Sequence, residues 1–199
     1  MFTGIVQGTA TVTSIVEGTT IRTLVLALPN VENLAIGASV AINGVCLTAT
    51  KIEHQDVHFD VIQETLTRTT RRELETGHQV NVERSLAFGD EIGGHLLSGH
   101  IMGTGLIQSI KEVGEGMDLS ILVPEEMRKY ILEKGYIGVD GISLTVGEIN
   151  QGCFSLHIIP ETLRLTTLGA HEIGDAVNLE IDSTTQTIVA TVERYLSQN

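Results

Sequence analysis

The dominant pattern along the chain is a short alternation of apolar and polar residues, which is typical of β-strands that bury one face. The stretch TATVTSIVEGTTIRTLVLALP, from Thr9, alternates on both sides of Glu17-Gly18, and this arrangement predicts a hairpin. The same period of two continues in VHFDVIQ, QVNVE, GLIQSI, DLSILVP, YIGVDGISLTVGEI, CFSLHIIP and AVNLEID. Several short strands with turn residues between them predict small antiparallel barrels.

Two stretches follow a helical pattern instead. PEEMRKYILEKG starts at Pro124, places acids in its first turn and ends at Lys134-Gly135, so it predicts a short helix, with a shorter counterpart after Pro29. After Asp182 the spacing of apolar residues predicts an amphipathic helix of about three turns, whose stripe comprises Ile188, Val189, Val192, Tyr195 and Leu196. Such a helix must bury its stripe, and we expect another subunit rather than a barrel to cover it.

The whole pattern is duplicated, because NGVCLT at residues 43–48 recurs as DGISLT at residues 140–145, an offset of 97. An offset of 95 places GIVQGTATVTSI, from Gly4, on GHIMGTGLIQSI. Self-similarity of this length indicates a duplicated domain. We therefore expect an all-β chain with short helices, divided into one barrel at residues 1–95, a second at residues 96–183 and a terminal helix at residues 184–199. The Gly-rich stretch from Glu83 to His100 is expected to join the barrels as a mobile or tightly turned connection.

Composition narrows the possible functions. The 199 residues are 42% hydrophobic and 19% charged, and no apolar stretch approaches the roughly 18 residues of a membrane span. The formal charge of −13 disfavours nucleic acid, anionic membranes and phosphorylated ligands. Cys46 and Cys153 occupy unmatched places in the two repeats, which disfavours a disulfide scaffold and favours a reducing compartment. Since the N-terminus has no signal-peptide pattern, we expect a cytoplasmic protein.

Motifs for metals and nucleotides are missing from the sequence. His95 and His100 are five residues apart without a third ligand nearby, so no metal site is predicted. The chain also lacks the P-loop pattern and the third glycine of a dinucleotide fingerprint. Aromatic residues are scarce, so a planar ligand would be held mostly by backbone groups, hydroxyls and aliphatic side chains.

Several motifs together resemble the riboflavin synthase family over essentially the whole chain: MFTGIV, NGVCLT, GGHLLSGHIMGTG, KGYIGVDGISLTV and IPETLRLTTLG, followed by a C-terminal helix. The resemblance implies two six-stranded antiparallel Greek-key barrels, each binding one molecule of 6,7-dimethyl-8-ribityllumazine. It also implies a homotrimer held by the C-terminal helices, with active sites between unlike barrels of neighbouring subunits. The implied transferase reaction moves a four-carbon unit between two lumazines, giving riboflavin and 5-amino-6-(D-ribitylamino)uracil, with no metal and no added cofactor.

The differences between the repeats fit that chemistry, because two copies of one substrate must act as donor and acceptor. The repeats share hydroxyls at Thr48/Thr145 and Thr65/Thr162, which suit a heterocycle or a ribityl chain. They differ in acid, base or nucleophile character at five pairs: Ile5/His100, Asn43/Asp140, Cys46/Ser143, Ser39/Tyr136 and Ser85/Asp182.

The resemblance implies that catalysis rests on residues from both repeats: Ser39, Cys46, His100, Asp140, Ser143 and Asp182. One lumazine would add a nucleophile at C7, from Ser39, Cys46 or water, while the other loses a proton from its 7-methyl group. Histidine suits proton transfer near neutral pH.

Each candidate also has a purely structural interpretation. A strand cysteine such as Cys46 is often a small buried hydrophobe, and Ser39 and Ser143 suit ordinary strand hydroxyls. Asp140-Gly141 is a common hairpin turn pair. Asp182, or Ser183, suits a helix cap, Lys134 can close its helix, and His100 beside a turn can be solvated.

The substrate-binding positions implied by the resemblance lie in matching segments of the two repeats. They are Gly4, Ile5, Val6, Cys46, Leu47, Thr48, Asp60, Val61, Ile62, Gln63, Glu64, Thr65, Gly99, His100, Ile101, Lys134, Ser143, Leu144, Thr145, Ile159, Pro160, Glu161, Thr162, Leu163 and Arg164.

One stretch departs from the family pattern. After Glu64-Thr65-Leu66 the first repeat reads TRTTRREL, so Arg71 and Arg72 replace an apolar turn at the edge of the first pocket. This departure makes the non-catalytic lumazine proteins of luminous bacteria an alternative. They bind a lumazine or flavin as an optical antenna, but they lose reactive positions of the second repeat that are present here, namely His100, Asp140 and Ser143.

Overall fold

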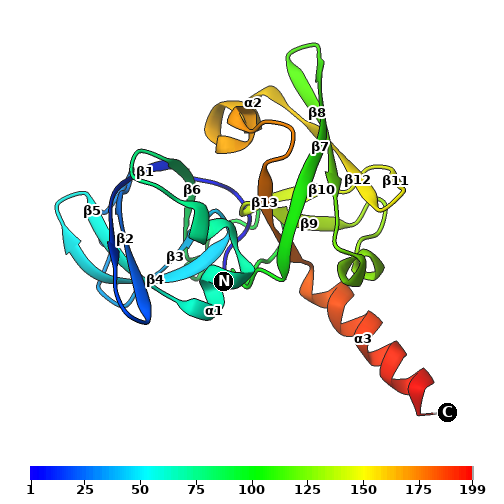
Figure 1. The fold of residues 1–199 in the computed structure, drawn as a ribbon, viewed down its shortest axis with the longest axis horizontal. Helices are drawn as coiled ribbons and strands as arrows, with labels where there is room; N and C mark the ends of the chain where they lie inside the picture. Colours follow the sequence, from blue (N-terminus) through cyan, green and yellow to red (C-terminus); the bar gives the residue numbers. More distant parts are fainter. Residues whose placement is uncertain (199) are drawn as a thin grey trace.

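The computed structural model describes residues 1–198, without the side chains of residues 71 and 72. Two β-barrels lie side by side, and one long helix projects from the second barrel (Figure 1). This arrangement confirms the expected fold class of two barrels followed by a C-terminal helix. None of the helices within the described residues has the length and hydropathy needed to span a membrane.

The first repeat forms a closed barrel with the strand order β1-β2-β5-β4-β3-β6. Antiparallel pairing of β1 and β2 confirms the hairpin predicted around Glu17-Gly18. A register shift between Val12 and Ser14 increases the local twist, which helps a small sheet to close. The strands are β1 (Gly8–Glu17), β2 (Ile21–Ala27), β3 (Ser39–Ile42), β4 (Val45–Glu53), β5 (Asp56–Ile62) and β6 (Gln79–Arg84).

The second repeat follows the same path with one interruption, so it has seven strands where six were expected. The counterpart of β4 is divided into β10 and β11, and the order is β10-β9-β13-β7-β8-β12-β11. Across the break, Gly147 N donates to Ser155 O at 2.8 Å and Ser155 N donates to Glu148 O at 2.9 Å. The strands are β7 (Gly103–Val113), β8 (Gly116–Leu122), β9 (Tyr136–Val139), β10 (Ile142–Thr145), β11 (Ile149–Asn150), β12 (Cys153–Ile158) and β13 (Ala176–Ile181).

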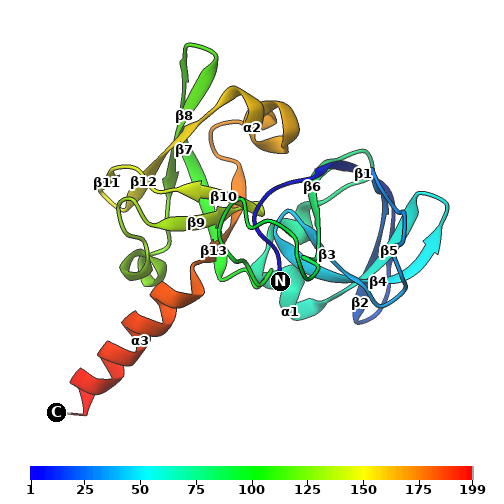
Figure 2. The same ribbon diagram turned by 180° about the vertical axis from the view of Figure 1, so that it is seen from behind.

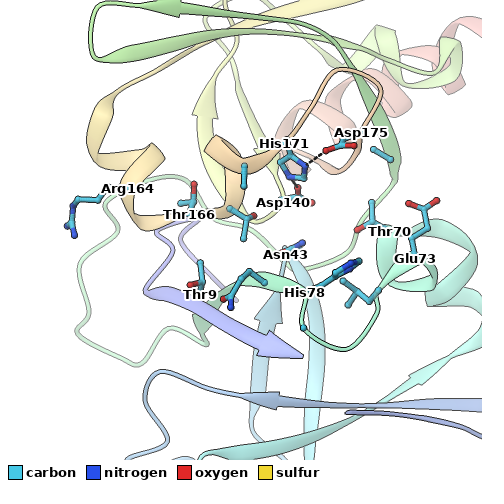
Figure 3. A pocket seen from close by; sticks show the side chains of 16 residues that line it. Thr9, Asn43, Thr70, Glu73, His78, Asp140, Arg164, Thr166, His171 and Asp175 are labelled. Atoms are coloured by element: carbon cyan, nitrogen blue, oxygen red, sulfur yellow. Dashed lines mark hydrogen bonds and ion pairs between the residues drawn. The ribbon is translucent and has the colours of Figure 1, made fainter. Parts of the chain in front are cut away.

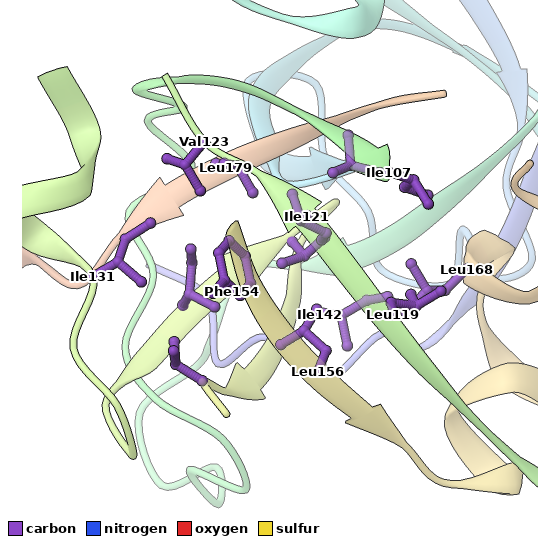
Figure 4. Packing of buried hydrophobic residues seen from close by; sticks show 14 of the residues in the cluster. Ile107, Leu119, Ile121, Val123, Ile131, Ile142, Phe154, Leu156, Leu168 and Leu179 are labelled. Atoms are coloured by element: carbon purple, nitrogen blue, oxygen red, sulfur yellow. The ribbon is translucent and has the colours of Figure 1, made fainter. Parts of the chain in front are cut away.

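Alternation along these strands builds two separate cores. In β12, Phe154, Leu156 and Ile158 face inward while Cys153, Ser155 and His157 face outward. Figure 4 shows Phe154 and Leu156 packed with residues of β8 inside the second barrel. The outward faces carry the polar residues of the duplicated motif, so a ligand would bind on the outside of each barrel.

Short helices follow β5 in the first barrel and its counterpart β12 in the second. The sequence pattern did not predict α1 (Gln63–Arg68) and α2 (Pro160–Leu165), because six residues are too few to show a helical period. The 3₁₀ helices η1 (Thr70–Glu73) and η3 (Thr167–Ala170) come next, so the TRTTRREL departure keeps the backbone of the second repeat. The side chains of Arg71 and Arg72 lie outside the described part of the chain.

The helix predicted after Pro124 is shorter than expected. It is a 3₁₀ helix, η2 (Glu125–Tyr130), and the chain is already extended at Ile131. Met127 and Ile131 are both buried in the second core, which anchors the segment at two points and ends the helix between them. Lys134 then takes a positive φ of 63° as the chain turns into β9.

The predicted C-terminal helix is confirmed as α3 (Ser183–Ser197). No residue of this helix is buried, and its predicted stripe is largely in solvent, with Ile188 59%, Val192 50% and Leu196 67% exposed. An ion pair between Lys129 Nζ and Glu193 Oε2, at 2.6 Å, ties the helix to η2. Figures 1 and 2 both show the helix pointing away from the barrels.

Candidate functional site

The two copies of the duplicated motif meet each other between the barrels. Gly44 and Gly141 both adopt φ of 79°, and each packs against the backbone of the other. A Cβ on Gly44 would lie 2.7 Å from the amide nitrogen of Gly141, and a Cβ on Gly141 would lie 2.6 Å from that of Gly44. Only glycine permits this approach together with the left-handed backbone.

Matched asparagines join the repeats around these glycines. Asn81 Nδ2 donates to Asp140 O at 3.0 Å, and Asn178 Nδ2 donates to Asn43 O at 2.9 Å. The amide oxygens complete the pattern, since Asn81 Oδ1 accepts from Thr167 N and Asn178 Oδ1 accepts from Thr70 N. These reciprocal bonds relate the barrels by an approximate two-fold axis and hold them against each other.

A buried glutamate in each barrel accepts hydrogen bonds from the segment that begins the same repeat. Glu83 on β6 accepts from Thr3 N at 2.6 Å and from Gly4 N at 3.0 Å. Glu180 on β13 accepts from Ser98 N at 2.6 Å and from Gly99 N. Burial raises the pKa of Glu83, although the hydrogen bonds to its carboxylate act in the opposite direction.

These segments then cross to the opposite barrel. Ser143 N donates to Gly4 O at 2.8 Å, and Cys46 N donates to Gly99 O at 2.9 Å. Val6 is buried in the second core and Ile101 in the first. The predicted binding segment 4–6 therefore lies beside Ser143 of the second repeat, and segment 99–101 lies beside Cys46 of the first. Periodicity along the sequence could not reveal this exchange.

A pocket of about 360 Å³ lies on the outer face of the second barrel, and we call it the second pocket. It brings together six of the predicted substrate-binding residues: Lys134, Ser143, Leu144, Thr145, Ile159 and Thr162. Val146, Gly147 and His157 complete its lining. Hydroxyl groups, one ammonium group and aliphatic side chains on an open face suit a planar, uncharged, polyhydroxylated ligand.

The corresponding face of the first barrel carries Ser39, Cys46 and Thr48. Ser39 and Thr48 are direct neighbours across β3 and β4, and Cys46 is half-buried beside Phe2, Ala41 and Leu97. His100 is exposed next to this face. Ser39, Cys46 and His100 are thus brought to one side of one barrel, while Ser143 lies in the second pocket.

Several predicted binding residues have side chains in the cores, so only their backbone can face a ligand. This holds for Val6, Leu47, Val61 and Ile101. Other predicted binding residues are exposed, namely Ile5, Asp60, Ile62, Gln63, Glu64, Pro160 and Glu161, while Thr65 and Leu163 are half-buried. Gly4 and Gly99 are buried, and they pack against Ser143 and Cys46 respectively. Arg164 pairs with Glu161 at 2.6 Å and lines the cavity between the barrels instead of the second pocket.

His95 also lies in this site. The sequence suggested it only as a metal ligand, an interpretation that was rejected. Its Nδ1 lies 2.6 Å from Ser143 Oγ, and its ring stacks on Tyr136 with centroids 5.1 Å apart. Burial lowers the pKa of His95, and the charge of Asp182 partly opposes this. A neutral imidazole therefore holds the Ser143 hydroxyl.

Asp140 is placed away from Ser143, in the cavity of about 730 Å³ between the barrels. Its side chain is 1% exposed, Oδ1 accepts from Asn178 N at 2.9 Å, and Oδ2 forms an ion pair with His171 Nε2 at 3.3 Å. Figure 3 shows His171 between Asp140 and Asp175. Burial opposes a charge on His171, but the two carboxylates outweigh it and raise its pKa. Both side-chain partners of Asp140 belong to the second repeat, and only its carbonyl oxygen bonds to the first repeat, through Asn81.

Asp182 lies at the junction of β13 and α3, and the capping alternative is confirmed. Its Oδ1 accepts from Thr185 N at 2.7 Å and from Thr185 Oγ1 at 2.8 Å, as an N-cap residue does. Among the described residues there is no group of three His, Cys, Asp or Glu side chains arranged to hold a metal ion.

Comparison with known proteins gives a consistent result. A family model described as the lumazine binding domain matches residues 3–85 and again residues 98–182. The chain is 52% identical over 200 residues to riboflavin synthase of Escherichia coli (strain K12), covering 99% of this chain and 94% of that protein. It is 47% identical over 169 residues to riboflavin synthase of Chlamydia pneumoniae, covering 85% and 82%.

Solved structures of a related protein share the fold. The crystal structure of LumP complexed with 6,7-dimethyl-8-(1'-D-ribityl) lumazine matches with a TM-score of 0.84 and 30% identity, covering 92% of this chain and 100% of that one. The complex of LumP with riboflavin matches with a TM-score of 0.85 and 31% identity over the same shares.

Proposed function

The chain belongs to the lumazine-binding family and, within it, to the riboflavin synthases, and on that premise we propose that it converts two molecules of 6,7-dimethyl-8-ribityllumazine into riboflavin and 5-amino-6-(D-ribitylamino)uracil. The observation that carries the proposal is a pair of like binding faces with unlike reactive groups. Thr48 and Thr145 occupy matching places beside Cys46 and Ser143. Such faces bind the same ligand twice and treat the two copies differently.

The chemistry requires a donor and an acceptor ring in defined contact. A nucleophile adds at C7 of one lumazine, and Ser39, Cys46 or water supplies it. The other lumazine loses a proton from its 7-methyl group, the resulting carbanion attacks the first ring, and elimination releases the products. Orientation of two rings contributes up to about 7 to 11 kcal/mol in favourable cases, and proton transfer by a residue such as His100 contributes roughly 10²- to 10⁴-fold.

The contacts between the barrels indicate that the two ligand-binding faces of one chain do not close on each other. Reciprocal Asn81 and Asn178 bonds fix the barrels, and the second pocket lies on an outer face. A second ring must then come from a neighbouring subunit. The projecting α3 supplies a means of association, and the functional form in this proposal is a cytoplasmic homotrimer in which unlike barrels of neighbouring subunits face each other.

The test is to mix purified protein with 6,7-dimethyl-8-ribityllumazine and to follow riboflavin by its fluorescence. We expect catalytic turnover, with one riboflavin formed for every two lumazines consumed. Absence of turnover, together with recovery of unchanged lumazine, would refute the enzyme and favour an antenna protein. The similarity to LumP supports that second function, but the higher identity to riboflavin synthases and the presence of Ser143 and His100 favour the enzyme.

A further inference from the structure

The second pocket contains an imidazole that is paired with a carboxylate. His157 lies on the outward face of β12 and lines this pocket beside Ser143, Thr145 and Lys134. Its Nδ1 is 2.6 Å from Asp118 Oδ1, directly across on β8. Because a carboxylate accepts the hydrogen bond, the neutral ring carries its proton on Nδ1, and Nε2 presents a lone pair.

The same cross-strand position is occupied in the first repeat by a different pair. Asp60 on β5 faces Thr23 on β2, and Thr23 Oγ1 donates to Asp60 Oδ1 at 2.7 Å. The offset of 97 carries Asp60 onto His157, and the offset of 95 carries Thr23 onto Asp118. Both repeats therefore place a hydrogen-bond acceptor at this point, and in each case a neighbouring strand orients it.

A second difference between the repeats makes room for the imidazole. Gly147 lines the second pocket, and a Cβ at this position would lie 3.3 Å from His157 Nε2. Its counterpart in the first repeat is Thr50. The larger side chain at position 157 is thus matched by a missing side chain at position 147, where a Cβ would also lie 2.4 Å from Ser155 Oγ, so no side chain at position 147 crowds Nε2.

From these contacts we propose that His157 is a ligand-binding residue of the second pocket, and that its Nε2 accepts a hydrogen bond from a hydroxyl of the ligand's polyhydroxyl chain. Asp118 is the positioning residue that fixes the tautomer and the ring. The first pocket uses the Asp60 carboxylate for the same contact. This inference rests on the proposed function only in taking the ligand to be a ribityl-bearing lumazine or flavin.

The experiment compares two flavins that differ in the polyhydroxyl chain. Riboflavin carries the chain and lumiflavin lacks it, and binding of each is followed by quenching of flavin fluorescence. We expect His157→Leu to weaken one of the two riboflavin sites per chain by roughly 2- to 12-fold, the range for one neutral hydrogen bond. Lumiflavin binding should not change. His157→Gln, whose amide oxygen reaches the position of Nε2, should restore most of the riboflavin affinity.

Two further variants separate positioning from general effects. Asp118→Ala should weaken riboflavin at the same site, and it should have no additional effect in the His157→Leu background, because the two residues act through one contact. The matched control is His58→Gln, which changes another histidine paired with a carboxylate, Glu53 at 3.3 Å, on the first barrel. His58→Gln should leave the affinity of the second pocket for riboflavin unchanged.

Each alternative result has a clear meaning. Equal weakening of riboflavin and lumiflavin, or unchanged riboflavin binding by His157→Leu, would overturn the assignment of His157 while wild-type turnover still supports the proposed function. Failure of the wild-type protein to bind either flavin would overturn both. His157 has 65% of its side chain exposed, so the variants should keep the wild-type melting temperature.

Discussion

The exposed stripe of α3 leads to the most discriminating prediction about assembly. Changing both Ile188 and Val192 to Asp places two charges one helical turn apart on a face of α3 that is largely exposed. Because no residue of α3 is buried in its own barrel, the fold of the barrels should be unaffected. The perturbation therefore acts on association alone.

The expected magnitude follows from the exposed fractions. Ile188, Val192 and Leu196 are 59%, 50% and 67% exposed, so a neighbouring subunit can still bury between half and two-thirds of each residue. At roughly 1.5 to 3 kcal/mol for full burial of one such residue, the three contribute about 3 to 5 kcal/mol per subunit. The double variant loses most of this and must also bury two carboxylates, which costs more still.

In sedimentation velocity experiments the sedimentation coefficient should fall, and the turnover rate should fall with it. We expect folded monomers that still bind one riboflavin per barrel but have lost nearly all conversion of lumazine. The matched control adds two aspartates on the opposite face, Gln186→Asp with Ser197→Asp, and should stay associated and active. A double variant that sediments as a monomer and yet keeps wild-type turnover at low protein concentration would refute an active site shared between subunits.

Three further predictions concern single residues. Gly44→Ala should lower the free energy of unfolding by about 2 to 5 kcal/mol in urea titrations, because it adds a steric clash to a left-handed backbone. The control Gly77→Ala has a φ of 95° and open space around the added Cβ, so it should lower the free energy of unfolding by only about 1 to 2 kcal/mol. His171 has a raised pKa in the folded state, so its stabilisation is complete below about pH 6.5 and is lost as pH rises through the folded value; His171→Asn should therefore destabilise the protein more at pH 6 than at pH 9. His95→Leu should lower turnover by roughly 2- to 12-fold through the lost bond to Ser143, and the same change should have no further effect when Ser143 is already Ala.

The sequence alone determined the architecture, because duplication and strand periodicity are local properties. A period of two in TATVTSIVEGTTIRTLVLALP is enough to predict the first hairpin, and the offset of 97 is enough to predict a second barrel like the first. The amphipathic stripe after Asp182 predicted α3 for the same reason. Where an element was too short to repeat a helical period, as in the six residues of α1 and of α2, the sequence could not predict the helix.

Only the tertiary structure decided which candidate residues share a site, because that depends on contacts between residues far apart in the chain. Ser143 and Asp140 are three residues apart, yet one lies in the second pocket and the other is buried between the barrels. The exchange of Gly4 and Gly99 between barrels places each repeat's first segment at the other's reactive position. His95, which the sequence offered only as a rejected metal ligand, holds the Ser143 hydroxyl because the linker crosses that strand. Strand periodicity records which face a residue occupies, and it carries no information about which distant segment covers that face.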